Sequence, residues 1–458
     1  MFNPEIFKAY DIRGIFGQDF NLDFAFQLGH AFVALRKKDK DYKTGAVLKI
    51  LVARDMRISS PSVSASLIAG LQAAGAEVID AGLLSTPAFY YNVSAEKADG
   101  GLMVSASHNP KEWNGFKMVR TKSLPISGNT GITWLKDNIN ENLSLASFES
   151  KNKAQVLLQG AEKQLIHDLK YLHPNKIKNF HIIADTANGM GMQFLELLEK
   201  NLPITIEKIN FNLDGSFPAH EADPLNPENI KQLSEAIINQ GADLGIATDG
   251  DGDRVFFLDN LGQLIDPAII RGLLAQIFLK DKPGSKICYD VRPGKITIDL
   301  IKEAGGIPVP SRVGHSLIKE QMLEEGAYFA GESSGHFFLN LEIGCFEMPI
   351  IMIGRLLELF SEQNSSVSDF IQQYRRYSHS GEINLSVGDK DKVLKLIQEK
   401  YADAKISLLD GVSISYPDYW FNVRASNTED KVRLNLEASE EKTMISKRDE
   451  VLKLIKSV

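Results

Sequence analysis

The sequence predicts an α/β protein in which three similar α/β domains with mixed, mainly parallel sheets are followed by a C-terminal α+β domain. Three segments share one plan: an apolar strand-like run, a turn bearing Asp or Gly, and a stretch with helical periodicity. Strands that alternate with helices favour a parallel sheet, because a parallel return needs a crossover connection. A chain of 458 residues is also too long for one compact core, and it therefore indicates three or four domains.

Apolar runs and helical patterns locate the elements of each segment. Paired strands and helices are predicted at 49–55 with 62–74, at 181–185 with 192–200, and at 286–290 with 296–304. The last part of the chain differs, since strand-like runs at 419–423 and 432–438 precede a helical pattern at 443–456. Polar stretches separate these regions, so the predicted domains are residues 1–153, 154–258, 259–368 and 369–458.

Composition excludes several classes of protein. The formal net charge is −8, from 51 Lys and Arg against 59 Asp and Glu, and no dense basic block favours nucleic acid. Apolar stretches such as 348–354 are far shorter than the roughly 18 apolar residues of a membrane span. Two cysteines, Cys288 and Cys345, cannot form a disulfide framework in so long a chain, and residues 1–10 show no secretory pattern. We therefore expect a cytoplasmic protein with a small-molecule partner, and neither nucleic acid nor a membrane.

The sharpest local signal is an acidic loop between two strand-like runs. Asp249, Asp251 and Asp253 alternate with glycines, which permit a tight backbone. Two like charges ~4 Å apart repel by about 4 kcal/mol at an effective dielectric of 20, so converging carboxylates require a cation, and all-oxygen ligands suit Mg²⁺. The alternative is a solvated acidic turn. An EF-hand is excluded, because Arg254 and Asn260 stand where that motif needs Gly and Glu.

A second signal is a serine at the end of a strand. Ser107 follows the apolar run 102–104, precedes His108, and lies in a loop held by Asn109-Pro110 and Asn114-Gly115. This placement suits nucleophilic or phosphoryl-carrier chemistry. Taken alone, the segment fits an ordinary Asn-Pro turn with an incidental serine better.

Two further loops carry polar side chains. The segment 331–336 matches the nucleophile-elbow pattern of hydrolases, but a strand-like run follows its serine where that motif needs a helix, so the hydrolase interpretation is rejected. Glu332 and Ser334 could instead bind sugar hydroxyls, or the loop could be a polar turn. The segment 424–429, with Arg433, could form a phosphate cradle or an ordinary surface turn. Dinucleotide and P-loop fingerprints are incomplete throughout.

Taken in order, the motifs at 10–14, 105–110, 249–254, 331–336 and 424–429 resemble the α-D-phosphohexomutase superfamily, and more narrowly its bacterial phosphomannomutase/phosphoglucomutase type. Further matches at 217–229 and 314–316 extend the resemblance over nearly the whole chain. The resemblance implies a heart-shaped, four-domain isomerase. It would interconvert hexose 1-phosphate and hexose 6-phosphate, of mannose or glucose or both, through a phosphoserine and a hexose 1,6-bisphosphate that reorients in the site.

The resemblance also assigns roles to residues. The implied catalytic residues are Ser107 as the phosphoserine, with Lys117, Arg254, His315, Arg13 and His108. The implied substrate-binding residues are Tyr10, Arg292, Glu332, Ser334, His336, Arg424, Ser426, Asn427, Thr428 and Arg433. The implied ligands of one Mg²⁺ per chain are Ser107, Asp249, Asp251 and Asp253.

The same resemblance implies a hexose 1,6-bisphosphate activator, a phosphosugar substrate and a monomer or weak dimer. Two other functions remain open on the sequence. One is a metal-dependent phosphomonoesterase that uses the same serine but releases phosphate to water. The other is a non-catalytic sugar-phosphate binding protein, which would have no need of both a carrier serine and a metal loop.

Overall fold

The computed structural model describes residues 2–148, 154–292, 294–425 and 431–457, which form two compact units. Each unit is assembled from separate stretches of chain. Unit 1 consists of Met1–Ile265 and Ser334–Ser368, and unit 2 consists of Asp266–Ser333 and Asp369–Val458. The chain therefore passes from unit 1 to unit 2, returns, and passes to unit 2 again.

The first sheet of unit 1 has the strand order β1-β5-β4-β2-β3-β6. Strands β4, β2, β3 and β6 are mutually parallel, whereas β5 is antiparallel to both of its neighbours. The strands are β1 (Ile12–Ile15), β2 (Lys49–Arg54), β3 (Glu77–Leu83), β4 (Gly100–Val104), β5 (Trp113–Arg120) and β6 (Gln155–Val156). The helices are α1 (Leu22–Arg36), α2 (Ser60–Ala73), α3 (Thr86–Ala95) and α4 (Thr133–Asn138). The predicted strand and helix at 49–55 and 62–74 are thus confirmed.

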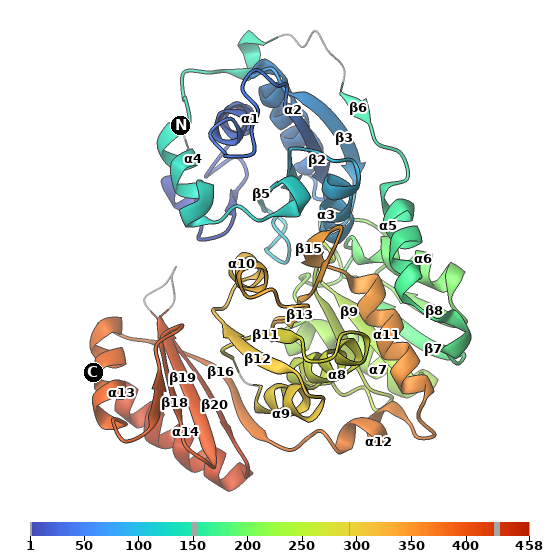
Figure 1. Ribbon diagram of the computed structural model, residues 1–458, viewed down its shortest axis with the longest axis vertical. Coiled ribbons are helices and arrows are strands. Elements are labelled where there is room, and N and C mark those ends of the chain that lie inside the picture. The colour runs from blue at the N-terminus through green and yellow to red at the C-terminus, as the bar shows by residue number, and fades with distance from the viewer. Residues whose placement is uncertain (1, 149–153, 293, 426–430, 458) are drawn as a thin grey trace. The chain divides into compact units, whose positions relative to one another are not determined.

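Burial explains why these residues form this sheet. All five residues of β4 are buried, as expected for a central strand covered on both faces. Helices α1 and α2 lie side by side (Figure 1), and glycine allows their close approach. A Cβ atom on Gly70 of α2 would lie 1.9 Å from the carbonyl oxygen of Phe26 in α1, so no larger residue fits there.

The second sheet of unit 1 has the order β10-β9-β7-β8, with β8, β7 and β9 parallel and β10 antiparallel to β9. Unit 1 also includes an antiparallel pair and a helix from its later stretch. The strands are β7 (Phe180–Asp185), β8 (Ile204–Ile209), β9 (Leu244–Thr248), β10 (Val255–Leu258), β14 (Phe337–Leu341) and β15 (Gly344–Glu347). The helices are α5 (Gly160–Asp168), α6 (Gly191–Asn201), α7 (Lys231–Gln240) and α11 (Pro349–Ser361). The hairpin of β9 and β10 presents the acidic loop.

Unit 2 combines parallel strands with a C-terminal antiparallel sheet. Strand β11 pairs in parallel with β12 and β13, and the C-terminal sheet has the order β16-β20-β19-β18-β17. The strands are β11 (Lys286–Asp290), β12 (Ile307–Ser311), β13 (Phe329–Gly331), β16 (Ser378–Ser386), β17 (Lys405–Ser407), β18 (Val412–Ser415), β19 (Tyr419–Ala425) and β20 (Lys431–Ala438). The helices are α8 (Pro267–Asp281), α9 (Lys295–Glu303), α10 (His315–Glu325), α13 (Lys390–Lys400) and α14 (Glu441–Ile455), while α12 (Val367–Gln372) spans the junction with unit 1.

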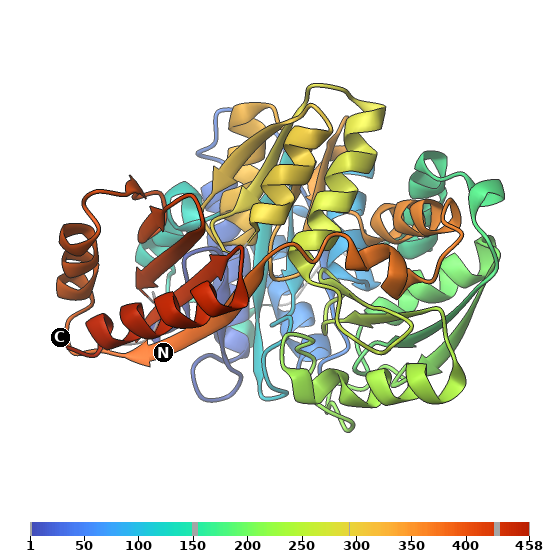
Figure 2. The same ribbon diagram turned by 90° about the horizontal axis from the view of Figure 1, so that it is seen from below.

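The C-terminal sheet has its own hydrophobic core. Val393 and Ile397 of α13 and Val451 of α14 are buried with residues of β18, β19 and β20. Figure 2 shows α14, in dark red, packed on this sheet. The predicted α+β character of the last part of the chain is therefore confirmed.

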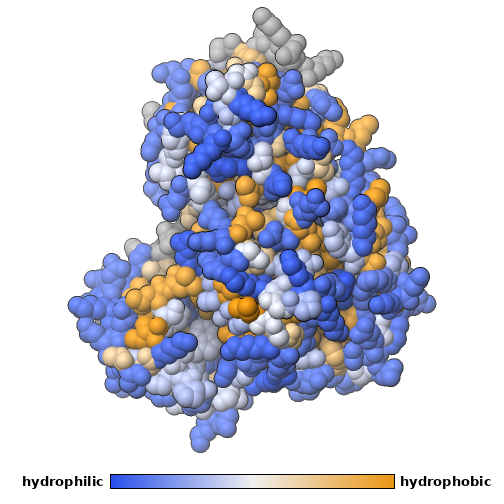
Figure 3. Space-filling model, viewed as in Figure 1, coloured by the Kyte–Doolittle hydropathy of each residue, from blue (hydrophilic) through white to orange (hydrophobic). Residues whose placement is uncertain are grey.

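The visible surface is mixed in character. Figure 3 shows hydrophobic residues scattered among hydrophilic ones on this face of the molecule. No helix among the described residues has both the length and the apolar character that a membrane crossing requires.

Candidate active site

Ser107 lies three positions after the end of β4, in a strained backbone conformation. Its φ of 52° is in the left-handed region, which non-glycine residues rarely adopt. Its backbone N–H donates to Ser105 Oγ at 2.9 Å, and its own hydroxyl donates to Asp249 Oδ2 at 2.7 Å. The serine loop and the acidic loop, which are far apart in the sequence, therefore meet at the hydroxyl.

The acidic loop brings three buried carboxylates together. One oxygen from each of Asp249, Asp251 and Asp253 lies within 4.8 Å of the others, and all three residues are at most 2% exposed. Asp249 Oδ1 accepts bonds from the N–H groups of Gly252 and Arg254, each at 3.1 Å, which fixes the turn. Burial, together with repulsion from the other two carboxylates, raises the pKa of Asp249 well above its ordinary value. The arrangement is one that a cation would stabilise.

Lys117 of β5 is the principal positive charge at this cluster. Its ammonium lies 2.9 Å from Asp251 Oδ2 and also bonds to Asp253 Oδ2. Burial alone would lower the pKa of Lys117, but the two carboxylates outweigh it and raise that pKa well above its ordinary value. Lys117 is therefore protonated at neutral pH.

His336, just before β14, completes the cluster from a distant part of the chain. Its Nε2 lies 3.1 Å from Asp253 Oδ1 and its Nδ1 lies 3.0 Å from Ser334 Oγ. Burial lowers the pKa of His336 to about 4 despite the neighbouring carboxylate. The ring is thus neutral at pH 7, and it can donate one hydrogen bond to Asp253 while Nδ1 accepts from Ser334.

Residues around the serine loop orient it. Arg13 of β1 donates to Asp11 Oδ2 at 2.7 Å and to Asn109 Oδ1 at 2.8 Å. His108 Nδ1 lies 3.3 Å from Ser107 Oγ, and burial lowers the pKa of His108 well below its ordinary value. Tyr10, immediately before Asp11, is partly buried.

Arg254 joins the acidic loop to the segment 217–229. Its guanidinium lies 3.8 Å from a carboxylate oxygen of Asp249 and 3.8 Å from one of Asp223. Ser107, His108, Lys117, Arg13, Arg254, Ser334, His336 and the three aspartates all belong to unit 1.

Tyr10 also belongs to unit 1, whereas Arg292, His315, Glu332, Arg424 and Arg433 belong to unit 2. Arg292 donates to Asp290 Oδ2 at 2.7 Å, and its guanidinium lies 3.7 Å from Glu332 Oε1. Glu332 in turn accepts from the N–H of Gly314 at 2.8 Å, immediately before His315, the first residue of α10.

The arginines of the expected phosphate loop share one acidic partner. Arg424 donates to Glu382 Oε2 at 2.8 Å, and Arg433 lies 3.4 Å from Glu382 Oε1. Burial would raise the pKa of Glu382, but Arg424 and then Arg292 lower it. The other expected members of this loop, Ser426, Asn427 and Thr428, lie outside the described residues.

Four family models match the chain in order. They describe phosphoglucomutase/phosphomannomutase α/β/α domains I, II and III and the C-terminal domain, at residues 4–145, 163–262, 266–377 and 382–454. The chain belongs to the phosphoglucomutase/phosphomannomutase family. The resemblance drawn from the motifs and the expected four-domain architecture are thus confirmed.

Individual relatives agree over nearly their full length. The chain is 38% identical to a phosphomannomutase of Methanocaldococcus jannaschii, over 98% of this chain and 97% of that protein. It is 35% identical to a phosphomannomutase of Escherichia coli, over 98% and 99%. A solved structure of a phosphoglucomutase/phosphomannomutase family protein from Burkholderia thailandensis superposes with a TM-score of 0.88 at 30% identity, covering 100% of this chain and 98% of that one.

Several residues of this family member were missed by sequence reasoning. Thr86, at the start of α3, donates to Asp251 Oδ2 at 2.6 Å, so it fixes one of the three carboxylates. Arg57, two residues after Asp55, bonds to the serine loop. Glu382 pairs with Arg424 and with Arg433. Only Arg57 had a usable signal, because charged residues just beyond a parallel strand lie at the edge of the sheet where sites form.

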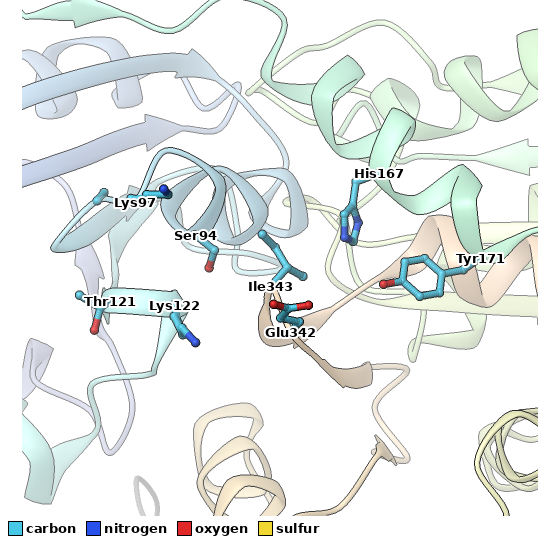
Figure 4. Close-up of a pocket in the computed structure, with 9 residues that line it drawn as sticks. Ser94, Lys97, Thr121, Lys122, His167, Tyr171, Glu342 and Ile343 are labelled. Atoms are coloured by element: carbon cyan, nitrogen blue, oxygen red, sulfur yellow. The ribbon is translucent and has the colours of Figure 1, made fainter.

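A cavity of about 580 Å³ lies in unit 1 and shares no lining residue with the carboxylate cluster. Figure 4 shows Lys97, Lys122, His167, Tyr171 and Glu342 around it. It combines cations, an anion, hydroxyls and an aromatic ring without a dominant charge.

Gly250 is expected to be essential for the meeting of the two loops. A Cβ atom at this position would lie 2.5 Å from the carbonyl oxygen of Ser107, so Gly250→Ala must displace the serine loop and the acidic loop relative to one another. A displacement of about 1 Å can cost roughly 100-fold in rate, and we expect a fall of that order in kcat for hexose-phosphate turnover. Gly388→Ala is the control, because its Cβ would meet no atom of the described residues within 4 Å. Equal kcat values for the two variants would contradict the expectation.

Asp290 is expected to stabilise unit 2 in a pH-dependent manner. It is fully buried; burial alone would raise its pKa, but Arg292 and Arg271 lower it to about 2. Since the folded-state pKa is depressed, the stabilisation is complete above the ordinary value near 4 and is lost as the pH falls to about 2; it amounts to about 2 kcal/mol.

Asp290→Asn should therefore lower the free energy of unfolding at pH 7 by at least about 2 kcal/mol, and by roughly 1 kcal/mol less at pH 3. Urea denaturation at both pH values measures this, with the exposed Asp391→Asn as the control. A loss that is the same at both pH values would show that the carboxylate charge is not the cause.

Proposed function

We propose that this chain is a phosphohexomutase that interconverts hexose 1-phosphate and hexose 6-phosphate of mannose, glucose or both. The observation that carries the proposal is the 2.7 Å hydrogen bond from Ser107 Oγ to Asp249 Oδ2, inside a buried cluster of three carboxylates. An incidental serine in a turn would have no reason to be held in a left-handed backbone against such a cluster.

In the proposed reaction Ser107 carries a phosphoryl group. The Ser107 Oγ–P bond breaks as phosphorus bonds to a free sugar hydroxyl; the hydroxyl proton passes to a base, and the serine oxygen receives a proton. The resulting hexose 1,6-bisphosphate turns around and returns its other phosphoryl group to Ser107. Because the serine is recharged in each cycle, no nucleotide is consumed.

The charged side chains support this transfer. Phosphoryl transfer depends on alignment and charge neutralisation, which Arg13, Lys117 and Arg254 would supply. Protonated Lys117 suits the role of proton donor to the serine oxygen, and His315 remains the candidate for the other proton transfer. The neutral His108 and His336 would act through hydrogen bonds.

The carboxylate cluster fits one Mg²⁺. All of its donors are oxygens, and among the described residues Asp251 Oδ1 has no hydrogen-bond partner although it is buried. Asp249, Asp251 and Asp253, with the group on Ser107, would hold the ion, which would offset the negative charge of the phosphoryl group.

Substrate recognition follows the family resemblance. Glu332 and Ser334 would bind sugar hydroxyls. The resemblance assigns Tyr10, Arg292 and His336 to substrate binding as well. The non-reacting phosphate would be bound by Arg424, Ser426, Asn427, Thr428 and Arg433. We also infer a cytoplasmic location, which the two free, buried cysteines support. A monomer or weak dimer is proposed from the family resemblance alone.

The test is turnover of glucose 1-phosphate and mannose 1-phosphate with Mg²⁺ and a trace of glucose 1,6-bisphosphate, followed by phosphorus NMR. We expect the corresponding 6-phosphate, loss of activity with EDTA, and recovery with added Mg²⁺. Release of inorganic phosphate in proportion to substrate consumed would instead identify a phosphomonoesterase. Binding without turnover would identify a binding protein.

A further inference from the structure

Arg57 is a buried arginine whose two terminal nitrogens donate to backbone oxygens of the serine loop and its continuation. Its Nη2 donates to the carbonyls of Ser107 at 2.8 Å and Asn109 at 2.6 Å. Its Nη1 donates to the carbonyls of Pro110 at 2.7 Å and Trp113 at 2.9 Å. One rigid planar group thus fixes four points along seven residues of the loop.

The guanidinium is enclosed by residues from two domains of unit 1. Its Nε lies 3.2 Å from Asp55 Oδ2, and both side chains are 0% exposed. The centroid of the Phe217 ring lies 5.1 Å from the guanidinium carbon. A Cβ on Gly215 would lie 2.5 Å from the Cα of Arg57, so the segment 210–229 presses directly on this arginine.

Arg57 contacts two residues with strained backbones, Ser107 and Phe217. Ser107 has φ 52° and Phe217 has φ 48°, and a left-handed conformation is a clear outlier for a bulky residue such as phenylalanine. Such conformations persist only where the surroundings enforce them. For Ser107 the constraints are Arg57 on its carbonyl, Ser105 Oγ on its N–H, and Gly250 against its carbonyl oxygen.

We propose that Arg57, held by Phe217, is a positioning residue for phosphoryl transfer. It keeps the backbone of Ser107 left-handed and thereby aims Oγ at Asp249. This inference rests on the proposed function, since it concerns the same serine. It accounts for the motif at 217–229, which contributes no side chain to the carboxylate cluster but supports the arginine that orients the nucleophile.

The alternative is that Arg57 only stabilises the fold through its ion pair with Asp55. Arg57→Lys separates the two roles, because lysine keeps the charge but an ammonium cannot span four carbonyls in two directions. The readout is the rate at which glucose 1,6-bisphosphate phosphorylates Ser107 in the full-length protein with Mg²⁺, followed by intact-protein mass spectrometry. We expect a fall of roughly 100-fold in this rate, with KM for hexose 1-phosphate changed by less than about threefold.

Arg36→Lys is the matched control. Arg36 is equally buried in the same domain, but it bonds to Asp39, Asp41 and the carbonyl of Asp99, away from the serine loop. This variant should lose thermal stability while it keeps the phosphorylation rate. Equal falls in rate for both variants would mean that the effect follows stability, and would overturn the proposal.

Phe217→Leu provides a second test that leaves all four hydrogen bonds in place. Loss of the ring contact should lower the phosphorylation rate by about fivefold with little change in Tm. Wild-type rates in both Arg57→Lys and Phe217→Leu would refute the positioning role while the mutase assignment stands. If the wild-type protein itself takes no phosphoryl group on Ser107, the proposed function fails and this inference fails with it.

Discussion

Ser107→Ala is expected to lower kcat for hexose-phosphate turnover by at least about 10⁴-fold, because it removes the atom that carries the phosphoryl group. The fold should survive, since the hydroxyl makes one strong hydrogen bond, to Asp249, and the left-handed backbone is held by other groups. Steady-state kinetics and thermal unfolding of the same preparation measure both parts. Mass spectrometry should show that the variant takes no phosphoryl group from glucose 1,6-bisphosphate.

Ser62→Ala is the matched control, because that exposed hydroxyl bonds only to the carbonyl of Ser59 among the described residues. A Ser107→Ala protein that kept more than about a hundredth of wild-type kcat would show that another group carries the phosphoryl group.

Lys117→Met is expected to lower kcat by about 10³-fold and to make folding depend on Mg²⁺. Lys117 is buried against Asp251 and Asp253, and its removal leaves three buried carboxylates without their main compensating charge. Removing one partner of a buried ion pair typically costs about 3–5 kcal/mol. The Tm in EDTA should therefore fall by several degrees, and added Mg²⁺ should raise Tm by more than it does in the wild-type protein.

The exposed Lys163→Met, which removes a surface ion pair with Glu96, should change neither property. If Mg²⁺ raised the Tm of Lys117→Met no more than that of the wild type, the carboxylates would not be the binding site of the ion.

The secondary structure was largely predictable because its patterns are local. The apolar runs at 49–55, 181–185 and 286–290 became β2, β7 and β11, each a parallel strand with an apolar sequence. The loop at 331–336 is followed by β14, as the rejection of the hydrolase motif required. In each case the deciding information lay within about ten residues of chain.

The supporting residues of the site were not predictable in the same way. Arg57 bonds to carbonyl oxygens 50 to 56 residues further along the chain. Every residue has a backbone carbonyl, so the sequence does not show which ones accept these bonds. Glu382 matters only because β16 pairs with β20 and brings it beside Arg424 and Arg433. Glu332 and Ser334 are two residues apart in the sequence but belong to different units. This division depends on tertiary packing, which the local sequence does not show.

The discontinuous course of unit 1 has a consequence for biosynthesis. A nascent chain emerging from the ribosome up to Ile265 still lacks β14, β15 and α11, which belong to the same unit. The intervening residues 266–333 must be synthesised before those elements can dock. Unit 1 therefore cannot be completed in the order of translation until Ser368 has left the exit tunnel.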